Sequence, residues 1–512
     1  RLVGCYERTR VFGTMAAMGN GGRCCFAKKS WPTASSRKHQ PRVLLGVMLL
    51  LLAFVRRQSA HSSSHLRLSN PCRVALKEIS RKKGRGLVLD PQSPSVRPGT
   101  LLYTCDPLVA AQSMEDELDP DKQVPLNLPE GWDAATMRLF ANQSFKLEKA
   151  LEERGHKKGA RRPLFLSLRL LARLLIFRSL GVSESARFTS LSGLMSHWES
   201  MTDYDRIVFY AQMATLIKET VGDELCPETR ECARLISTLQ LNALSVLSRE
   251  DLQPIGMAIY PDLALINHDG RPNCVVTFDG WTASLVCIRE IKPGEEILID
   301  YISHAMTRRE RVKVLREEFH INETEALHAE REGPDPSPSD VEKLMEAQDK
   351  IATTLESMND AVARAEQYRA QLERQGLPHR ISGHDRDVWE IANEAWRYIN
   401  SSVSLYQLCY HSFHPVISYQ HLMLGKLSFH LGRSKACMEN LETALHGLAV
   451  AFGTHSRHFL VEAAENLLAR ARREFPLDDV TILDDMPPPP PPPQKNRYRR
   501  APALLQEDGI DV

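Results

Sequence analysis

The chain has 512 residues, of which 43% are hydrophobic and 25% are charged, with a formal net charge of +1. This composition is typical of a globular protein, and the length indicates two or three domains. The balanced charge excludes a protein-wide basic field, so no direct binding of nucleic acid is expected.

The eleven cysteines are scattered along the chain and never form a C-x-x-C pair. An odd number without a regular framework fits a reducing compartment better than a secreted disulfide scaffold. The spacing also excludes an obvious structural zinc cluster.

Residues 1–69 are rich in Ser and Arg and are predicted to be an extension outside the fold. Within them, residues 43–55 ("VLLGVMLLLLAFV") follow a basic stretch. Thirteen apolar residues are too few for a comfortable membrane span, but a basic flank and a short apolar core resemble a signal peptide or membrane anchor. Whether the mature protein contains this segment stays open.

The first elements are predicted strands. Residues 72–90 ("CRVALKEISRKKGRGLVLD") alternate apolar side chains around a glycine-containing turn, which predicts two short strands. Residues 96–109 predict a Pro-Gly turn followed by another strand. Residues 111–162 change from acidic to basic and contain several prolines, so an irregular insertion is expected there.

Helical periodicity follows in residues 164–177, 191–201 and 205–221. Strand patterns are predicted from Leu239 to Tyr301, with a turn at Pro293-Gly294. Residues 307–319 ("TRRERVKVLREEF") predict a charged amphipathic helix.

Beyond a proline-containing linker at 333–338, the chain is predicted to be helical. The capping-box spacing of residues 339–342 (Ser-Asp-Val-Glu) predicts the start of a long helix that runs towards Gly376. Residues 421–453 have the pattern of a tetratricopeptide-like helix pair, although an ordinary helical bundle fits equally well. Seven prolines at 487–493 predict a disordered polyproline segment, either a ligand for proline-binding modules or a spacer.

Two polar stretches carry the chemistry. Residues 259–278 ("IYPDLALINHDGRPNCVVTF") place Asn267 and His268 at the end of an apolar run. Residues 287–302 ("CIREIKPGEEILIDYI") end in Tyr301. Taken alone, the first is an ordinary polar loop and Tyr301 an ordinary core tyrosine. Glu295 and Glu296 are a poor acid–base pair, because adjacent strand residues face opposite sides of a sheet.

Together, "NHDGRPNC" and "GEEILIDY" resemble the two-part signature of the SET-domain lysine methyltransferases. Within that superfamily the chain is most similar to the SET-and-MYND (SMYD) group. The segments "KKGRGLVL", "CDPLVA", "MSHWESM", "LNALSV" and "HPVISYQHLMLGKLSFHLGR" also resemble that group. The resemblance covers residues 72–110 and 165–470.

The resemblance implies an α+β fold, a β-rich SET domain followed by an all-α tetratricopeptide-like domain. The Asn-His and Tyr segments would meet in a knotted-looking arrangement. The expected domains are the SET domain at 70–325, the helical domain at 339–475 and the tail at 476–512. Within the SET domain, 111–162 would replace the MYND module, 163–240 would be a helical insert and 304–325 a post-SET segment.

The resemblance also implies binding of S-adenosylmethionine on one face and entry of a substrate lysine from the other. Tyr301 would be the catalytic tyrosine, and the channel would be lined by Leu244, Tyr301 and Phe319. The implied cofactor-binding residues are Lys83, Gly84, Arg85, His197, Asn242, Asn267, His268, Phe319 and Ile321.

The chain departs from the SMYD pattern at both zinc sites. Residues 111–162 contain no cysteine, so the MYND finger is absent or replaced. The post-SET cysteines are missing too, with Gly270 in the loop and none in "FHINETEALHAE". We therefore expect no zinc, and a Phe319–Ile321 lid that packing holds or that is mobile.

The predicted function is S-adenosylmethionine-dependent methylation of lysine in a histone or non-histone protein. The alternative is a weak or inactive SET fold that serves as a protein-interaction module. The expected location is the cytoplasm, the nucleus or both, and the alternative is secretion or anchoring through residues 43–55.

Overall fold

The computed structural model describes most of the two predicted domains. The described residues are 74–80, 84–112, 146–147, 149–150, 153, 162–179, 191–322, 336–375, 383–454 and 456–475. The apolar segment at 43–55, nearly all of the 111–162 insertion and the proline run at 487–493 lie outside them. Among the described residues, no helix is both long and apolar enough to cross a membrane.

The strands form small sheets that join distant parts of the chain. The bounds are β1 (Val74–Ser80), β2 (Gly84–Leu89), β3 (Leu101–Cys105), β4 (Val109–Gln112), β5 (Ala243–Leu247), β6 (Pro254–Ile259), β8 (Cys274–Asp279) and β9 (Thr282–Cys287). The strands β1 and β2 pair antiparallel, as predicted. Two three-stranded sheets have the orders β3-β9-β8 and β4-β6-β5. Strands from before and after the helical insert therefore share sheets, and the two halves of the fold form one unit.

A short parallel pair brings the two motif segments together. The strand β7 (Asn267–His268) pairs with β10 (Leu298–Ile299), and Asn267 lies opposite Leu298. Parallel neighbours need a crossover connection, which here consists of β8, β9 and the Pro-Gly turn. The predicted meeting of the Asn-His and Tyr segments is confirmed.

The helical insert has its own apolar core. The helices α5 (Arg162–Ser179), α7 (Tyr204–Val221) and α8 (Thr229–Asn242) bury their apolar side chains together against β4. Residues 239–242, predicted as the start of a strand, form the last turn of α8 instead. The change to a strand comes at Ala243, where the backbone becomes extended.

The predicted helix at residues 191–201 is also wrong in most of its length. Residues 193–201 contain only the 3₁₀ helix η3 (Trp198–Ser200). His197 adopts a left-handed conformation (φ 51°), which a right-handed helix cannot contain. The Ser196 hydroxyl accepts from the N–H of Trp198, a local bond that competes with helix formation.

The C-terminal region is helical, as predicted. The helices are α9 (Arg308–Phe319), α11 (Pro338–Arg374), α12 (Gly383–Cys409), α13 (Pro415–His430), α14 (Ser434–Phe452) and α15 (Phe459–Glu474). The start of α11 differs from the prediction, because Ser337 and Asp340 form the capping box rather than residues 339–342. Pro338 takes the first helical position, where its missing N–H costs no hydrogen bond.

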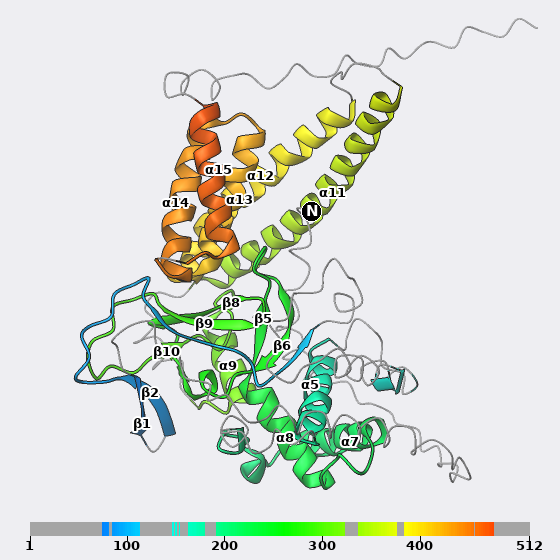
Figure 1. The fold of residues 1–512 in the computed structure, drawn as a ribbon, viewed down its shortest axis with the longest axis vertical. Coiled ribbons are helices and arrows are strands. Elements are labelled where there is room, and N and C mark those ends of the chain that lie inside the picture. Colours follow the sequence, from blue (N-terminus) through cyan, green and yellow to red (C-terminus); the bar gives the residue numbers. More distant parts are fainter. Residues whose placement is uncertain are drawn as a thin grey trace, which may run out of the picture.

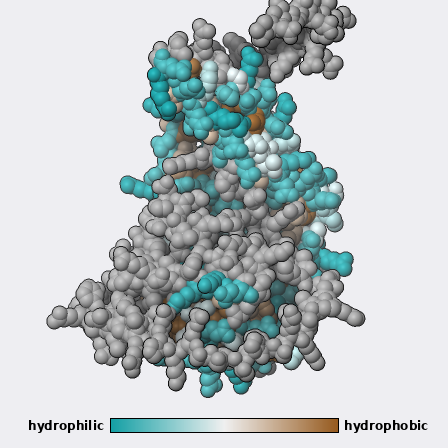
Figure 2. Space-filling view, turned by 90° about the vertical axis from the view of Figure 1, so that its right-hand side faces the viewer, coloured by the Kyte–Doolittle hydropathy of each residue, from teal (hydrophilic) through white to brown (hydrophobic). Residues whose placement is uncertain are grey.

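The strands lie between two groups of helices. In Figure 1, α11–α15 stand on one side of β5, β6, β8 and β9, and α7 and α8 lie on the other. Two contacts fix α14 and α15 to the sheets. The N–H of Thr454 donates to the Gly99 carbonyl (3.0 Å), and a His458 ring nitrogen lies 3.0 Å from the Phe278 carbonyl oxygen. On the face shown in Figure 2, the described residues of the C-terminal helices are mainly hydrophilic.

Candidate functional site

Asn267 connects β7 to two other segments. Its amide nitrogen donates to the Arg85 carbonyl (3.2 Å) and to Glu296 Oε1 (2.7 Å). Both bonds use the amide nitrogen, so the amide oxygen is the atom suited to accept a hydrogen bond from a ligand. The side chain is therefore oriented by its surroundings.

Gly86 makes this close approach possible, and motif matching did not identify it. A Cβ atom there would lie 2.6 Å from the Asn267 amide nitrogen and 2.9 Å from Glu296 Oε1. Any side chain would push Asn267 away from β2. The sequence shows two glycines close together, Gly84 and Gly86, but it does not show which of them faces Asn267.

Tyr301 lies next to His268. Its N–H donates to His268 Nδ1 (3.1 Å), and its hydroxyl donates to the Ile266 carbonyl (2.5 Å). Burial, together with the charge of Glu296, raises the pKa of the Tyr301 hydroxyl well above its usual range. At neutral pH the group is therefore a phenol whose oxygen lone pairs accept hydrogen bonds, and it is not a phenolate base.

Phe319, the last residue of α9, packs on Tyr301. Its ring centroid lies 5.2 Å from that of Tyr301, a distance typical of packed aromatic pairs. The helix ends at His320 in a left-handed cap, and the N–H of Ile321 bonds back to the Leu315 carbonyl. This cap fixes the direction in which Phe319 and Ile321 leave the helix.

His197 and His320 form the contact between the insert and this cap. Their ring centroids are 4.6 Å apart. Burial lowers the pKa of both rings, and for His320 the nearby His197 and Arg206 lower it further. Both rings are therefore favoured in the neutral form, which removes repulsion across the contact.

Two further hydrogen bonds join Arg85 and Asn242 to the insert. Arg85 Nη2 donates to the Gly193 carbonyl (2.6 Å), and the Asn242 amide donates to the Met195 carbonyl (2.9 Å). Residues 193–197 thus connect β2, the end of α8 and the His197–His320 contact.

These contacts form a closed circuit. Starting from Asn267, it passes through Arg85, residues 193–197, His320, Phe319, Tyr301 and His268. Most of the predicted site residues lie on it or beside it. Gly84 precedes Arg85 in the chain, while Leu244 lies on β5 and packs against the same core as Tyr301. Lys83 lies outside the described residues.

Arg206 anchors the segment around Phe319. It donates to the Glu317 carbonyl (2.8 Å) and forms an ion pair with Glu318 (3.3 Å). The N-terminal turn of α7 is thereby tied to the C-terminal turn of α9. Together with the two histidines, this contact holds the Phe319–Ile321 segment by packing and hydrogen bonds.

Asn273, the second Asn of the motif, has a structural role. It is fully buried, its amide nitrogen donates to the Glu296 carbonyl (2.8 Å), and its amide oxygen accepts from the Leu298 N–H (2.9 Å). It fixes the chain that enters β10 against the loop that leaves β7. Its position in the motif was visible in the sequence, but its burial and partners were not.

The two adjacent glutamates, which precede β10, have different partners. Glu296 accepts from Asn267, whereas Glu295 pairs with Arg289 (3.6 Å) and accepts from the Lys292 N–H. They do not form a catalytic pair.

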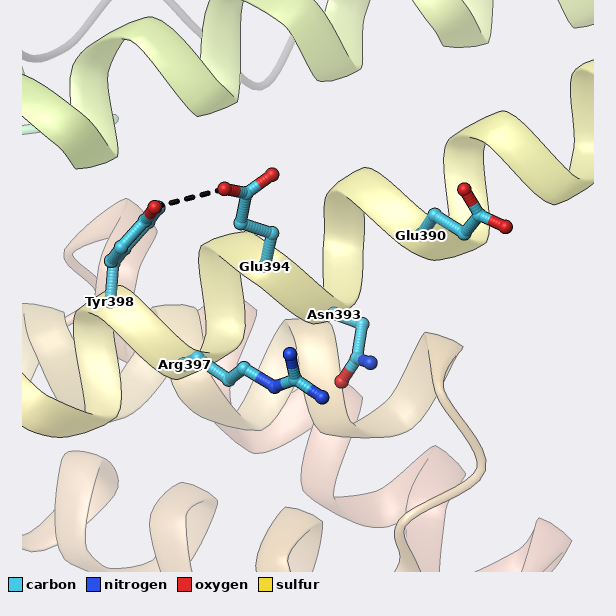
Figure 3. A pocket seen from close by; sticks show the side chains of 5 residues that line it. All are labelled: Glu390, Asn393, Glu394, Arg397 and Tyr398. Atoms are coloured by element: carbon cyan, nitrogen blue, oxygen red, sulfur yellow. Dashed lines mark hydrogen bonds between the residues drawn. The ribbon is translucent and has the colours of Figure 1, made fainter. Parts of the chain in front are cut away.

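A hollow of about 450 Å³ on α12 is separate from this circuit. It is lined by Glu390, Asn393, Glu394, Arg397 and Tyr398. In Figure 3 the Tyr398 hydroxyl bonds to Glu394 on one side of the helix, while Asn393 and Arg397 extend to the other. All five side chains come from one helix, and we assign no chemistry to this hollow.

Comparisons with known proteins show what the chain is similar to. The family model described as "SET domain" matches residues 97–302. The chain is 26% identical to the histone-lysine N-methyltransferase SMYD3 of Mus musculus, covering 58% of this chain and 73% of the relative. It is 27% identical to the histone-lysine N-methyltransferase ASHR1 of Arabidopsis thaliana, covering 59% and 74%. A shorter match, 30% identical over 31% of this chain and 36% of the relative, is to the N-lysine methyltransferase SMYD2-B of Danio rerio.

The matched range contains the paired β7 and β10 strands, and Tyr301 lies at its C-terminal end. Several relatives extend the likeness beyond that range, since they cover more of the chain than the SET domain alone. The chain therefore contains a region that matches the SET domain, and it is similar to methyltransferases of the SMYD group.

Proposed function

We propose that this protein is an S-adenosylmethionine-dependent protein-lysine N-methyltransferase with Tyr301 as its catalytic tyrosine. The observation that carries the proposal is the contact circuit around Asn267, His268, Tyr301 and Phe319. It contains several of the residues that the family resemblance assigns to the cofactor and to the lysine channel, which supports the proposal. The methyltransferase names of the relatives support the same activity.

The polar groups of the circuit suit S-adenosylmethionine. Asn267 keeps an amide oxygen for an ammonium group, and Gly84, at the start of β2 with φ 71°, would let the backbone lie close to the ligand. His197, His268 and Asn242 would complete the polar contacts. Ile321 would cover the adenine with less stacking than an aromatic side chain provides. When bound, the cofactor supplies an electrophilic methyl group on a sulfonium.

Tyr301 would orient the reacting amine. Its hydroxyl proton is donated to the Ile266 carbonyl, so its oxygen is directed by the backbone and presents lone pairs as acceptors. Methyl transfer in line from a sulfonium requires alignment more than an acid. A neutral tyrosine held in one orientation meets this requirement.

Phe319 and Leu244 would form the apolar walls of the lysine channel. The aliphatic stem of lysine packs favourably against such walls. The amine must be neutral to react, and removal from water lowers the pKa of an ammonium group from its reference value of about 10.4. Exclusion of water by these side chains would therefore favour the reactive form.

The test is transfer of a labelled methyl group to a mixed protein extract by the wild type and by Tyr301→Phe. We expect the variant to lose about 100-fold in rate, the loss typical of one pre-organised transition-state group. Calorimetric binding of S-adenosylmethionine should stay within about threefold of the wild type, a difference of about 0.7 kcal/mol.

Tyr260→Phe is the matched control. Tyr260 is also buried and donates to a backbone carbonyl, that of Trp281 (2.6 Å), but it lies outside the circuit. Tyr260→Phe should transfer methyl groups at the wild-type rate. Equal activity of wild type and Tyr301→Phe would contradict the role of Tyr301. Absence of cofactor binding by the wild type would favour the protein-interaction alternative.

We propose the finer features on the same basis. The substrate is a lysine of a histone or another protein, and the site works in the cytoplasm or nucleus without post-SET zinc. The proline run at 487–493 is proposed to bind a proline-recognising module. The tetratricopeptide-like character of α11–α15 likewise stays a prediction.

A further inference from the structure

A histidine-rich cluster lies where the SET domain meets the C-terminal helices. Asp300, the residue before Tyr301, is partly buried at this junction. Its Oδ2 lies 3.7 Å from His411 Nε2, and its Oδ1 lies 3.0 Å from His304 Nε2. His411 and His414 come from the connection between α12 and α13. None of these groups has a role in the methyl transfer proposed above.

We propose that Asp300, His411 and His414 bind a zinc-type divalent cation that links the Tyr301 segment to the C-terminal helices. One ligand atom from each of the three residues lies within 4.8 Å of the others. Zinc bonds of about 2.0–2.2 Å place tetrahedral ligand atoms roughly 3.3–3.5 Å apart. Side-chain movements of roughly an ångström would close the cluster around the ion, and a water molecule would take the fourth position.

The ligand types select the metal. Two imidazoles and one carboxylate suit zinc and similar transition metals, whereas calcium and magnesium prefer sites built from oxygen alone. Zinc ligation requires an ionised carboxylate and neutral imidazoles.

The surroundings support the carboxylate and the two segments. His304 contacts the Asp300 oxygen that does not face His411, which is the position of an orienting partner in metal sites. The hydroxyls of Ser303 and Tyr410 are 2.9 Å apart, so the segment after Asp300 is already tied to the end of α12. The metal would reinforce an existing contact.

One hydrogen bond has to change. His414 is the N-cap of α13, and its Nδ1 accepts from the N–H of Val416 (3.2 Å). In a neutral ring the proton is then on Nε2. Ligation through Nδ1 replaces the cap bond directly, and ligation through Nε2 moves the proton to Nδ1, so the cap bond is lost in either case. A single cap bond is weak beside coordination of zinc. Loss of the cap bond therefore does not prevent zinc binding. A variant of His414 that keeps a capping side chain can test the role of the imidazole alone.

The experiment uses the full chain after removal of metal by a chelator. Zinc affinity is measured by competition with a fluorescent indicator, and Co²⁺ is added as a spectroscopic probe. We expect one additional zinc per chain in the wild type compared with His411→Ala, and visible Co²⁺ absorption from this site that the variant lacks. Because the wild type and His411→Ala share all other cysteines and histidines, zinc bound to those residues cancels in the comparison.

His414→Asn keeps an N-capping side chain but removes the imidazole, so it should retain the helix and weaken zinc binding at this site at least tenfold. His421→Ala, on α13 outside the cluster, should bind as the wild type does. Thermal unfolding of each metal-free chain shows that it is folded.

Equal zinc stoichiometry and equal Co²⁺ spectra in the wild type, His411→Ala and His414→Asn would overturn the proposal, as would a wild type that binds no metal. Since the readout is metal binding, the result is independent of whether the methyltransferase proposal holds.

Discussion

Asn273 connects two segments through both ends of its amide. Replacement by Ala would leave the partly buried Glu296 carbonyl and Leu298 N–H without these partners. Each such loss costs about 1–3 kcal/mol, so we expect Asn273→Ala to lower the free energy of unfolding by about 2–4 kcal/mol. Chemical denaturation measures the change. Asn400→Ala, at an exposed position of α12, should stay within about 0.5 kcal/mol of the wild type, and a similar result for Asn273→Ala would refute this role.

Gly86 makes a second prediction, which concerns binding. A Cβ atom there would lie 2.6 Å from the Asn267 amide nitrogen, so Gly86→Ala must displace that side chain. If Asn267 contacts the cofactor, the affinity for S-adenosylmethionine should fall at least tenfold, which corresponds to about 1.4 kcal/mol. Calorimetry provides the measurement.

The control for this variant is Gly383→Ala. Nothing lies within 4 Å of the Cβ position of Gly383, so its affinity should match that of the wild type. If Gly86→Ala bound the cofactor as tightly as the wild type, Asn267 would not be a cofactor-binding residue.

At the residue scale, the sequence identified the polar groups but not the residues that support them. Asn267, His268 and Tyr301 stand in a recognisable motif, and the structure brings them together. Gly86 and Asn273 act through buried contacts with segments far away in the chain. Such contacts depend on strand register, which a single sequence does not define.

At the element scale, the type of most elements was predictable and their ends were not. The apolar periodicity of residues 191–201 matches a helix, but the left-handed His197 and the Ser196 side chain override it. Residues 339–342 and the pair Ser337–Asp340 both have capping chemistry. The structure selects Ser337, because Pro338 favours the first helical position.

The capping box of α9 links this scale to the site. Thr307 accepts from the N–H of Glu310, and the helix ends at Phe319. We expect Thr307→Ala to lower the free energy of unfolding by about 1 kcal/mol and also to weaken cofactor binding, because α9 positions Phe319 and Ile321. Thermal unfolding and calorimetry are measured on the same samples.

Ser337→Ala, in the corresponding box of α11, is the matched comparison. It should have a similar effect on stability and none on cofactor binding. If both variants weakened binding equally, the effect would not come from the position of α9.

At the scale of the whole molecule, the fold class and the order of the regions were predictable from the two-part motif and the helical C-terminal pattern. The packing of the C-terminal helices on the strands was not. It depends on single contacts such as that between Thr454 and Gly99, which are 355 residues apart in the chain. A Cβ atom at Gly99 would lie 2.7 Å from the Thr454 hydroxyl, so the contact also needs a glycine.

His458 makes this packing dependent on pH. Its Nδ1 accepts from the Leu460 N–H, so the neutral ring carries its proton on Nε2 and donates to the Phe278 carbonyl. Burial lowers the pKa of this ring below 6.5, and Arg249 lowers it further, while Phe278 and Asp279 oppose the shift. Below pH 6.5 the unfolded chain therefore binds a proton that the folded chain excludes, and stability falls with pH.

His458 alone changes the free energy of unfolding by at most about 1.4 kcal/mol per pH unit. In His458→Asn, an N-cap for α15 remains, but the bond to Phe278 and the stacking on Phe452 (3.7 Å between ring centroids) are lost. The variant should be less stable than the wild type at pH 7.5, and the difference should narrow as the pH falls from 6.5 towards 5. Thermal unfolding across this range measures both chains, and a difference that stays constant with pH would show that His458 does not titrate between the folded and unfolded states.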